Sequence, residues 1–376
     1  MPLLERGVRR PGEYSLGPGA AAGAMSILLT VLRDPDALPR LTRQDWNLLL
    51  RESRSQQLCA RLSWIIETRG QVSACPEAAW IDLAAQRFFA EHKQAQVRLE
   101  LRKLRKALAP KGVPILLLKG AAYAHAGLRV ARGRDFADLD IMVPTDQLEA
   151  AETALEAGGW LMETKDRYDQ RYYRRWMHEL PPMHHRTRSF EVDIHHALLP
   201  LTGRLRPNPA LLWAASRVLP DSPCRVLCDE DMLLHSAAQV FQDGEIAGEL
   251  GALLDLHQLM EELGQREGFW QRLVPRAEAL QLGRPLYYAL RFCTKLLDTP
   301  VPAEVLRAAQ AQAPGRVSKG LMDRLVPRVL EPRYPTRRPA HVAAWFLYMR
   351  SHWLRMPPGL LALHLLRKAL RTGKAG

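Results

Sequence analysis

The chain changes character near Gly112, where short apolar runs replace a repeating helical pattern. Before this point apolar residues are spaced three and four apart, which predicts helices over 26–110. The runs VPILLLKG, DLDIMV, WLMETK and SFEVDIHHALL are short and bounded by Gly, Pro or polar residues, which favours buried strands. A short helix and a basic loop separate the first two runs. We therefore predict an α/β (α+β) fold with a small mixed sheet and helices on both sides of it in the sequence.

Shifts in composition divide the chain into five expected regions. They are a disordered N-terminus over 1–25, a helical region over 26–110, a sheet-containing core over 111–206, a helical domain over 207–315, and a basic C-terminal segment with amphipathic helices over 316–376. The first region is rich in Gly, Ala, Arg and Pro, and Met25 is an alternative start of the protein.

The overall composition is that of a globular protein. The 376 residues are 47% hydrophobic and 25% charged, which is enough for two or more compact units. The five cysteines are scattered and odd in number, which favours a reducing compartment and a cytoplasmic protein. Cys224 and Cys228 have no second pair to complete a zinc site. No run approaches the roughly 18 apolar residues of a membrane-spanning helix.

The net charge of +13 is concentrated at the C-terminal end. From Arg316 onward, 13 Lys and Arg face only Asp323 and Glu331, whereas the preceding residues carry 40 basic and 38 acidic side chains. The basic charge is therefore a property of the last segment, which limits what it says about the predicted core.

Asp138 and Asp140 are the first candidate chemical groups. Side chains two apart in a strand point to the same face, at a backbone separation of about 6–7 Å. Two carboxylates on one face repel each other unless a cation lies between them, and Mg²⁺ carrying triphosphate oxygens is a common solution. The pattern in ADLDIMV therefore predicts a metal site.

Asp193, in EVDIHH, offers a third carboxylate from a separate predicted strand. Three carboxylates can hold two metal ions, an arrangement suited to attack of an acceptor oxygen on phosphorus. In this hypothesis Asp193 serves the acceptor side. Lys119, Gly120 and Arg134 precede the carboxylates and are predicted to bind phosphate, because Lys119 and Gly120 lie where a strand gives way to a helix.

The order of these motifs resembles the uncharacterised nucleotidyltransferase family of the DNA polymerase β superfamily. The resemblance rests on LLLKGAAYAHAGL, RDFADLDIMVP, HH and VDIHHALL over about 115–200, and the RSHWLRMP segment also resembles the C-terminal part of that family. It implies a minimal nucleotidyltransferase sheet with helical additions. It also implies metal ligation by Asp138, Asp140 and Asp193, with Mg²⁺ as cofactor and a nucleoside triphosphate as donor.

Several histidines and aromatic residues surround the third carboxylate in the sequence. His185 and His195 are the stronger candidates for binding the nucleotide, orienting Asp193 or acting as a base, ahead of His178, His184 and His196. Packed or surface histidines are the competing interpretation. Tyr172, Tyr173 and Trp176 are candidates for an acceptor or base platform, and a loop packed over the sheet explains them equally well.

The C-terminal run HVAAWFLYM, flanked by arginines, has the composition of a helix at a membrane surface. We favour instead an amphipathic helix packed on its own domain, with peripheral contact at the inner membrane face as the alternative. Nucleic acid is a less favoured partner, because the basic residues do not alternate with stacking aromatic side chains.

The favoured function is Mg²⁺-dependent transfer of a nucleoside monophosphate from a nucleoside triphosphate, with ATP favoured, to an unidentified acceptor. A small molecule, glycan, peptide or protein would each meet the same metal site. One alternative is a kinase that transfers the γ-phosphoryl group at this site. Another is a non-catalytic nucleotide-binding partner protein in a biosynthetic or membrane-associated assembly.

Overall fold

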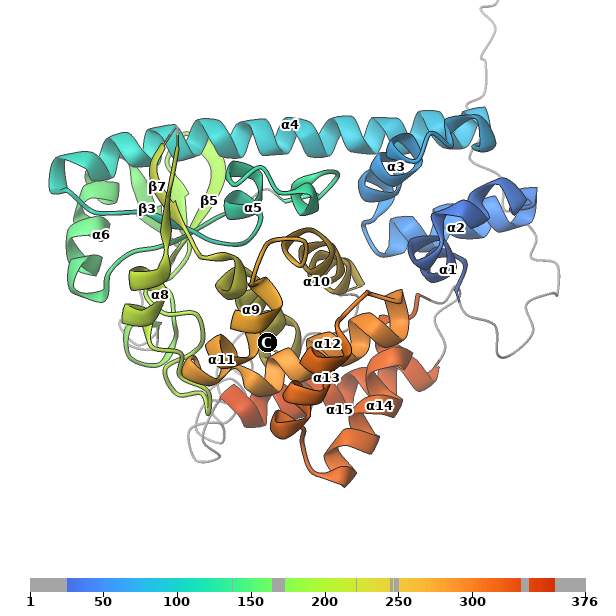
Figure 1. Cartoon of the computed structure of the whole chain (residues 1–376). Helices are drawn as coiled ribbons and strands as arrows, with labels where there is room; N and C mark the ends of the chain where they lie inside the picture. The colour runs from blue at the N-terminus through green and yellow to red at the C-terminus, as the bar shows by residue number, and fades with distance from the viewer. Residues whose placement is uncertain are drawn as a thin grey trace, which may run out of the picture.

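The computed structural model shows a mixed α/β protein built on one seven-stranded sheet (Figure 1). It describes residues 26–136, 138–163, 173–220, 222–243, 246, 250–332 and 338–355. The strands are β1 (Leu116–Leu117), β2 (Asp138–Met142), β3 (Trp160–Met162), β4 (Met183–His185), β5 (Arg188–His195), β6 (Arg217–Leu219) and β7 (Ser222–Val226). Their order across the sheet is β3-β4-β5-β2-β1-β7-β6.

The sheet is mixed because two of its pairings are parallel. Strand β2 runs parallel to β5, and β1 runs parallel to β7, whereas β1 and β2 are antiparallel to each other. Strands β2 and β1 therefore lie in the interior of the sheet. Leu139, Ile141 and Met142 of β2 are fully buried, as expected for the apolar residues of a central strand.

The helices predicted before the sheet are present. They are α1 (Ile27–Arg33), α2 (Arg43–Ser55), α3 (Cys59–Thr68) and α4 (Glu77–Leu108). Thr42 caps α2 through a reciprocal capping box with Asp45, which fixes where that helix begins. The long helix α4 runs along the top of the molecule in Figure 1, from α3 at one end to the sheet and α6 at the other. It therefore joins the N-terminal helices to the sheet.

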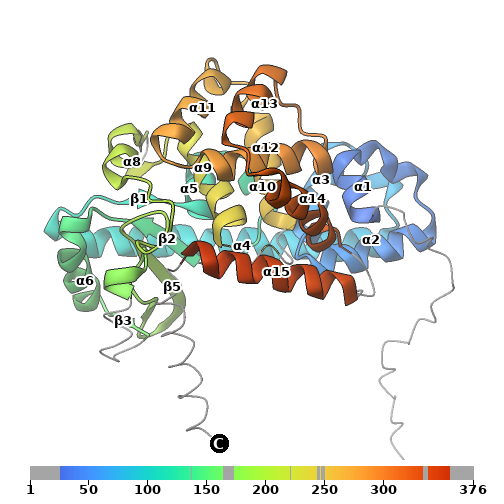
Figure 2. The same cartoon turned by 90° about the horizontal axis from the view of Figure 1, so that it is seen from below.

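The helices that connect and follow the strands complete the molecule. They are α5 (Lys119–His125), α6 (Leu148–Ala157), α8 (Pro209–Ala215), α9 (Asp229–Ala238), α10 (Leu250–Leu263), α11 (Phe269–Ala279), α12 (Gly283–Leu297), α13 (Ala303–Ala309), α14 (Arg316–Leu330) and α15 (Arg338–Arg355). Figure 2 shows α15 stretched along the surface of the molecule, beside the sheet and the other helices.

The N-terminal helices contact the C-terminal part of the molecule. Arg33 of α1 forms an ion pair with Asp298 at the end of α12, and the backbone N–H of Ser26 donates to the Glu331 carboxylate at 3.2 Å. The N-terminal helices are thus fastened to the C-terminal ones.

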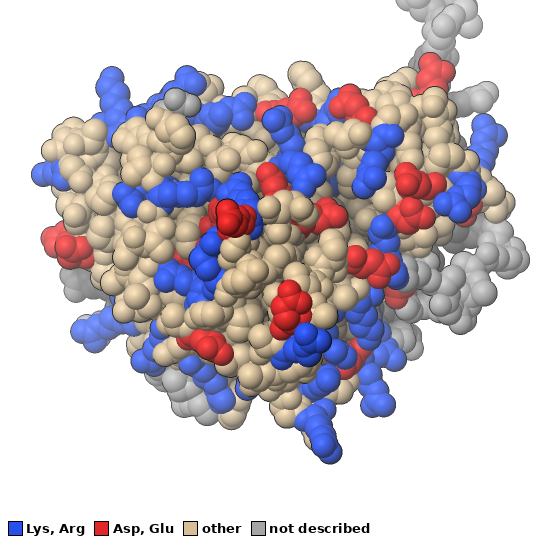
Figure 3. Space-filling model, in the orientation of Figure 1, with Lys and Arg blue, Asp and Glu red and all other residues tan. Residues whose placement is uncertain are grey.

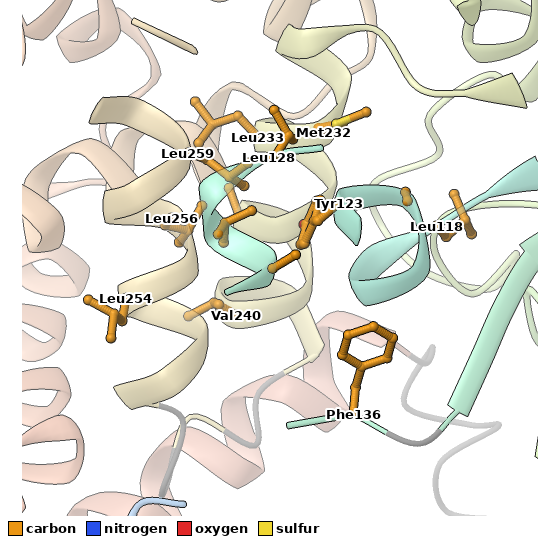
Figure 4. Close-up of a cluster of buried hydrophobic side chains, with 14 of the residues drawn as sticks. Leu118, Tyr123, Leu128, Phe136, Met232, Leu233, Val240, Leu254, Leu256 and Leu259 are labelled. Carbon is orange, nitrogen blue, oxygen red and sulfur yellow. The ribbon is translucent and has the colours of Figure 1, made fainter. Parts of the chain in front are cut away.

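One continuous hydrophobic core links these layers, from Leu28 of α1 to Leu347 of α15. Figure 4 shows its central part, where Tyr123 of α5 and Leu128 face Leu233 of α9 and Leu256 of α10. The turn that follows α5 is therefore held against helices encoded more than 100 residues later.

The structure differs from the sequence-based prediction in several elements. Strands β4, β6 and β7 were not predicted, and β7 pairs with β1 although only helices were expected beyond residue 206. The predicted helix from Thr145 begins as a 3₁₀ turn over Thr145–Gln147 before α6. Helix α15 continues through RSHWLR, which was expected to separate two helices, whereas residues 1–25 and GLLALHLLRKAL lie outside the described part of the chain.

Basic charge in three dimensions is not confined to the C-terminal segment. On the face seen in Figure 3, Lys and Arg side chains occur along the upper edge, where α4 lies, as well as around α13 and α14 at the lower edge. All five cysteines are free. Among the described residues, no helix combines the length and apolarity required to cross a membrane.

Candidate active site

Strands β2 and β5 bring the three predicted aspartates together. Their parallel register places Asp140 directly opposite Asp193, and Asp138 lies two residues earlier on the same face of β2. One carboxylate oxygen from each residue can be chosen so that all three lie within 4.8 Å of one another. The predicted juxtaposition of these side chains is therefore present in the fold.

Lys119 lies at the junction between β1 and α5, beside this group. Its backbone adopts a left-handed conformation with φ of +47°, which is uncommon for a residue other than glycine. The side chain reaches across to Asp140, with Nζ 2.5 Å from Oδ1. Burial disfavours the charged ammonium, but Asp140 outweighs burial and raises the pKa of Lys119. Lys119 is therefore a fixed cation at the edge of the carboxylate group.

The three carboxylates have different electrostatic surroundings. Burial would raise the pKa of Asp140, but Lys119 and His195 outweigh it and hold that pKa well below its usual range. Burial and the adjacent Asp140 raise the pKa of Asp138. Burial, Asp140 and Glu179 raise the pKa of Asp193 to about 7. The three carboxylates repel one another. Lys119 and His195 more than offset this repulsion at Asp140, whereas the pKa values of Asp138 and Asp193 remain raised.

Gly120 lies under the side chains of Arg134 and Phe136. A Cβ atom added to Gly120 would lie 2.3 Å from Nη1 of Arg134 and 2.7 Å from Cγ of Phe136. Any larger side chain must therefore displace Arg134. The guanidinium of Arg134 is also 5.4 Å from the centre of the Phe136 ring, which holds it in a stacked position beside the cleft.

Arg134 is anchored by a buried ion network that sequence reasoning did not find. Its Nε donates to Asp255 of α10 at 2.8 Å, and Arg61 of α3 donates to the other oxygen of Asp255 at 2.7 Å. Arg61 is 2% exposed and also donates to Gln258 at 2.6 Å. Burial opposes the charge of Arg134, but Asp255 raises its pKa. Helices from both sides of the sheet in the sequence thus position one cleft arginine.

His195 is buried behind Asp140 rather than exposed to the cleft. Its Nε2 lies 3.0 Å from Oδ1 of Asp140 and 3.6 Å from Oε2 of Glu179, and only 1% of its surface is accessible. His178 lies 3.6 Å from the same Glu179 oxygen, so His178, Glu179 and His195 form a second group of convergent side chains. Burial and the neighbouring His195 hold the pKa of His178 well below its usual range.

The two histidines of β4 differ in their position relative to the cleft. His184, and not the predicted His185, lines it. The ring of His185 instead packs 5.0 Å from Trp160, and Nη1 of Arg188 lies 2.7 Å from its Nε2. Adjacent residues of a strand point to opposite faces of the sheet, so only one of these two histidines can face the cleft. The sequence alone does not show which one it is.

His196, Tyr173 and Trp176 are not part of the described cleft wall. His196 is buried, and burial together with His195 lowers its pKa to about 4. Tyr172 lies outside the described residues, whereas Tyr173 and Trp176 belong to a short helical turn before β4 that is not part of the described cleft wall.

A polar cleft of about 690 Å³ opens in front of the carboxylates. Its described lining consists of Gln57, Lys93, Lys119, Arg134, Asp135, Phe136, Asp138, Asp140, His184, Phe190 and Glu191. The volume falls within the range of about 300–1,000 Å³ typical of small-molecule sites. Three cations and several carboxylates in one wall suit a ligand that carries both phosphate groups and a metal ion.

The donor set fits a hard divalent cation. Asp138, Asp140 and Asp193 offer only oxygen ligands, which Mg²⁺ prefers. Burial and, after it, repulsion by Asp140 and Glu179 raise the pKa of Asp193, and a bound cation would offset both. The histidines near Asp140 could ligate softer metals through nitrogen, but they do not belong to the carboxylate group itself.

Sequence reasoning missed Glu179, Asp255, Arg61 and Gln57. Each lies in an unremarkable local pattern, and Arg61 and Asp255 meet although 194 residues separate them in the chain. Only the pairing of distant helices reveals such contacts.

Comparison with known proteins agrees with this geometry. Neither the curated proteins nor the solved structures contain a match to the chain. The family model described as an uncharacterised nucleotidyltransferase matches residues 42–298, a range that contains the sheet, Lys119, Arg134 and all three aspartates. The match ends within the helical part, before α14 and α15, so it does not include the RSHWLRMP segment. Because the match covers about two thirds of its length, the chain belongs to the uncharacterised nucleotidyltransferase family.

Proposed function

We propose that this protein transfers a nucleoside monophosphate from a nucleoside triphosphate, with ATP the favoured donor, to an acceptor nucleophile. Membership of the nucleotidyltransferase family supports this class of reaction. The observation that carries the proposal is the parallel register of β2 and β5, which sets Asp193 opposite Asp140 with Asp138 on the same face. Such a group in a cleft that Lys119 and Arg134 also line is suited to metal-assisted phosphorus chemistry.

In this proposal Asp138, Asp140 and Asp193 hold Mg²⁺. The bound metal supplies positive charge that steadies the phosphate oxygens and the leaving pyrophosphate. Asp138 and Asp140 face the triphosphate, since both line the cleft, whereas Asp193 lies on the neighbouring strand and serves the acceptor side.

Lys119 and Arg134 bind the triphosphate. Lys119 lies at the cleft with its ammonium fixed by Asp140. Arg134 is held by Asp255 through Nε, and its Nη1 lies over Gly120. Arg134 therefore needs little rearrangement to meet a phosphate oxygen, because its rotamer is already set. Gly120 contributes by leaving room for that guanidinium.

The acceptor oxygen or nitrogen attacks the α-phosphorus of the donor. A new bond from the acceptor to phosphorus forms, and the bond from the α-phosphorus to the oxygen that bridges the α- and β-phosphates breaks. Pyrophosphate departs with that electron pair, and the acceptor proton passes to solvent. Placing the two reactants in one cleft is the main contribution of this chain to the rate.

His195 orients Asp140 in this scheme. It is buried, and its Nε2 contacts Asp140, so it holds the carboxylate rather than touching the nucleotide. His184 takes the nucleotide contact that was first expected of His185, because His184 lines the cleft.

The proposal is tested with each of the four nucleoside triphosphates, with and without Mg²⁺. Binding is measured by calorimetry for the wild-type chain, an Asp138→Asn/Asp140→Asn double variant and an Asp135→Asn control. Asp135 lines the same cleft but pairs with Lys93 at 2.8 Å, so its loss removes a cleft carboxylate outside the metal-binding group. Metal-dependent binding should survive in the control and be lost in the double variant.

Products then separate this reaction from its alternatives. ATP labelled at the α- or γ-phosphate is incubated with Mg²⁺ and panels of hydroxylated small molecules, glycans, peptides and proteins. Release of pyrophosphate with α-label on the acceptor supports the proposal. ADP with γ-label on the acceptor would show a kinase, and tight binding without any transfer would show a nucleotide-binding partner protein.

A further inference from the structure

Helix α15 lies on the surface with one side turned inward. Ala343, Leu347 and Ser351 are each 1% exposed, and their spacing of four residues puts them on one face of the helix. Arg350 also points back into the molecule, where it donates to the carbonyl of Phe241 at 2.9 Å and lies over the Tyr288 ring. The inner face of α15 is therefore a well-packed contact that holds this helix in place.

The outer face of α15 is apolar and exposed. Val342, Phe346, Met349 and Trp353 follow one another at spacings of four, three and four residues, and their exposed fractions run from 42% to 57%. Trp345 and Tyr348 flank this stripe and are 56% and 43% exposed. The stripe covers about three turns of the helix, roughly 16 Å. Contiguous exposed apolar side chains of this kind mark an interaction surface.

The loop 200–206 after β5 extends this surface at the C-terminal end of α15. The backbone of Arg204 donates to the carbonyl of Leu354 at 3.2 Å, and its guanidinium lies 4.9 Å from the Trp353 ring centre. Leu201 of the same loop is 40% exposed. We call the outer stripe of α15 together with Leu201 and Arg204 the α15 surface.

The charged residues after Glu331 are all basic. Nine Lys and Arg follow it in the sequence, although Arg350 among them points into the molecule and adds no charge to the outer face. Exposed Arg204 and Arg206 add to this charge from the neighbouring loop. A second copy presenting the same face would set basic residues against basic residues, which opposes self-association. An anionic surface is complementary in charge.

The aromatic and basic side chains of the α15 surface favour a lipid bilayer over other anionic partners. Trp and Tyr favour the boundary between lipid headgroups and acyl chains, where arginines can meet the lipid phosphates. A helix that lies in this boundary buries one apolar face and does not cross the bilayer. Helix α15 fits this peripheral geometry, because its inner face is packed on the protein and its outer face is apolar and exposed.

We propose that the α15 surface docks on an anionic phospholipid bilayer. The aromatic stripe enters the headgroup region, and the basic residues around it contact lipid phosphates. This inference is independent of the proposed nucleotidyl transfer, since α15 lies outside the cleft and outside the range of the family match.

The test is sedimentation of the full-length protein with vesicles of phosphatidylcholine alone or mixed with phosphatidylglycerol. A Trp345→Gln/Phe346→Gln variant removes two exposed aromatic side chains from the stripe. The matched control is Phe88→Gln/Phe89→Gln on α4, where the pair is 66% and 59% exposed. Circular dichroism and thermal melting establish that both variants fold.

We expect the wild-type chain and the α4 control to pellet with anionic vesicles and not with neutral ones. The α15 variant should partition about tenfold more weakly, because two large apolar groups no longer leave water. Binding should also fall as salt is raised from about 0.05 to 0.5 M.

Three results would overturn the proposal. One is that the folded wild-type chain fails to bind anionic vesicles. Another is that binding survives the α15 substitutions but is lost when Arg367, Lys368, Arg371 and Lys374 are changed to Gln, which would assign it to the C-terminal sequence. The third is a dimer in solution that the α15 variant abolishes, which would assign the face to a second copy.

Discussion

Nζ of Lys119 and the ring of His195 reach the same oxygen of Asp140, at 2.5 Å and 3.0 Å. Asp140 is 2% exposed, so this carboxylate is ionised in a buried place only because two donors surround it. The same arrangement sets a cation beside the two remaining carboxylates.

Changing Lys119 to Gln should weaken binding of nucleoside triphosphate by about 10- to 100-fold, the usual loss for one charge-assisted hydrogen bond. Calorimetry in the presence of Mg²⁺ measures this. Lys93→Gln is the matched control, because Lys93 lines the same cleft but pairs with Asp135. Equal losses in both variants would mean that general positive charge, and not Lys119 itself, binds the phosphates.

Gly120→Ala should reduce both stability and nucleotide affinity. The added methyl group would lie 2.3 Å from Nη1 of Arg134, so Arg134 must move, and overpacking of this kind costs about 1–3 kcal/mol. The control is Gly320→Ala in α14, where nothing lies within 4 Å of an added Cβ and a helical Ala should be neutral or stabilising. Urea denaturation and calorimetry measure the two effects. Unchanged affinity in Gly120→Ala would show that Arg134 does not bind the nucleotide.

Asp255→Asn should lower the free energy of unfolding by about 3–5 kcal/mol, because the buried guanidinium of Arg61 and the partly buried one of Arg134 lose the carboxylate they share. The comparison is Asp323→Asn, which breaks a more exposed pair with Arg291 and should cost less than about 1 kcal/mol. Chemical denaturation gives both values. If the two variants lose the same stability, the network does not anchor Arg134 as described.

Asp193→Asn should stabilise the metal-free protein at pH 8. Burial and the neighbouring carboxylates raise the pKa of Asp193 to about 7, so the folded state holds this proton more tightly than the unfolded state. The wild-type chain therefore loses stability as pH rises from about 4 to 7, and the variant should not. The gain at pH 8 should be about 2–4 kcal/mol and should vanish near pH 4.

Urea denaturation across this range, without metal, gives the comparison for Asp193. Glu191→Gln on the same strand controls for the general loss of negative charge. A gain for Asp193→Asn that is constant with pH would contradict the electrostatic explanation. Added Mg²⁺ should then stabilise the wild-type chain more than the Asp193→Asn variant.

Acid should destabilise the fold through histidines that are buried in the neutral form. Burial is the main cause that lowers the pKa of His196 to about 4 and that of His235 to about 3. The unfolded chain binds protons at these residues first, so stability should fall as pH drops from about 6.5 to 4.5, by about 2 kcal/mol for each histidine. His235→Gln should flatten this dependence, whereas His341→Gln at an exposed position should not.

Local pattern predicted much of this protein. Helical spacing predicted the helices before the sheet, and the short apolar runs predicted β1, β2, β3 and β5. Alternation in a strand was enough to put Asp138 and Asp140 on one face, and the order of motifs was enough to indicate the family. These features depend on residues near one another in the chain, so a single sequence carries them.

Tertiary structure decided which of these features meet. The register that sets Asp193 opposite Asp140 depends on β5 pairing with β2, and β7 joins β1 after more than 100 residues. The sequence also left undecided which side chains would face the cleft or the solvent. His184, and not the expected His185, lines the cleft, and the aromatic side chains on the outer face of α15 are exposed. Strand pairing and helix packing are set by the free energy of the whole core, which no local spacing encodes.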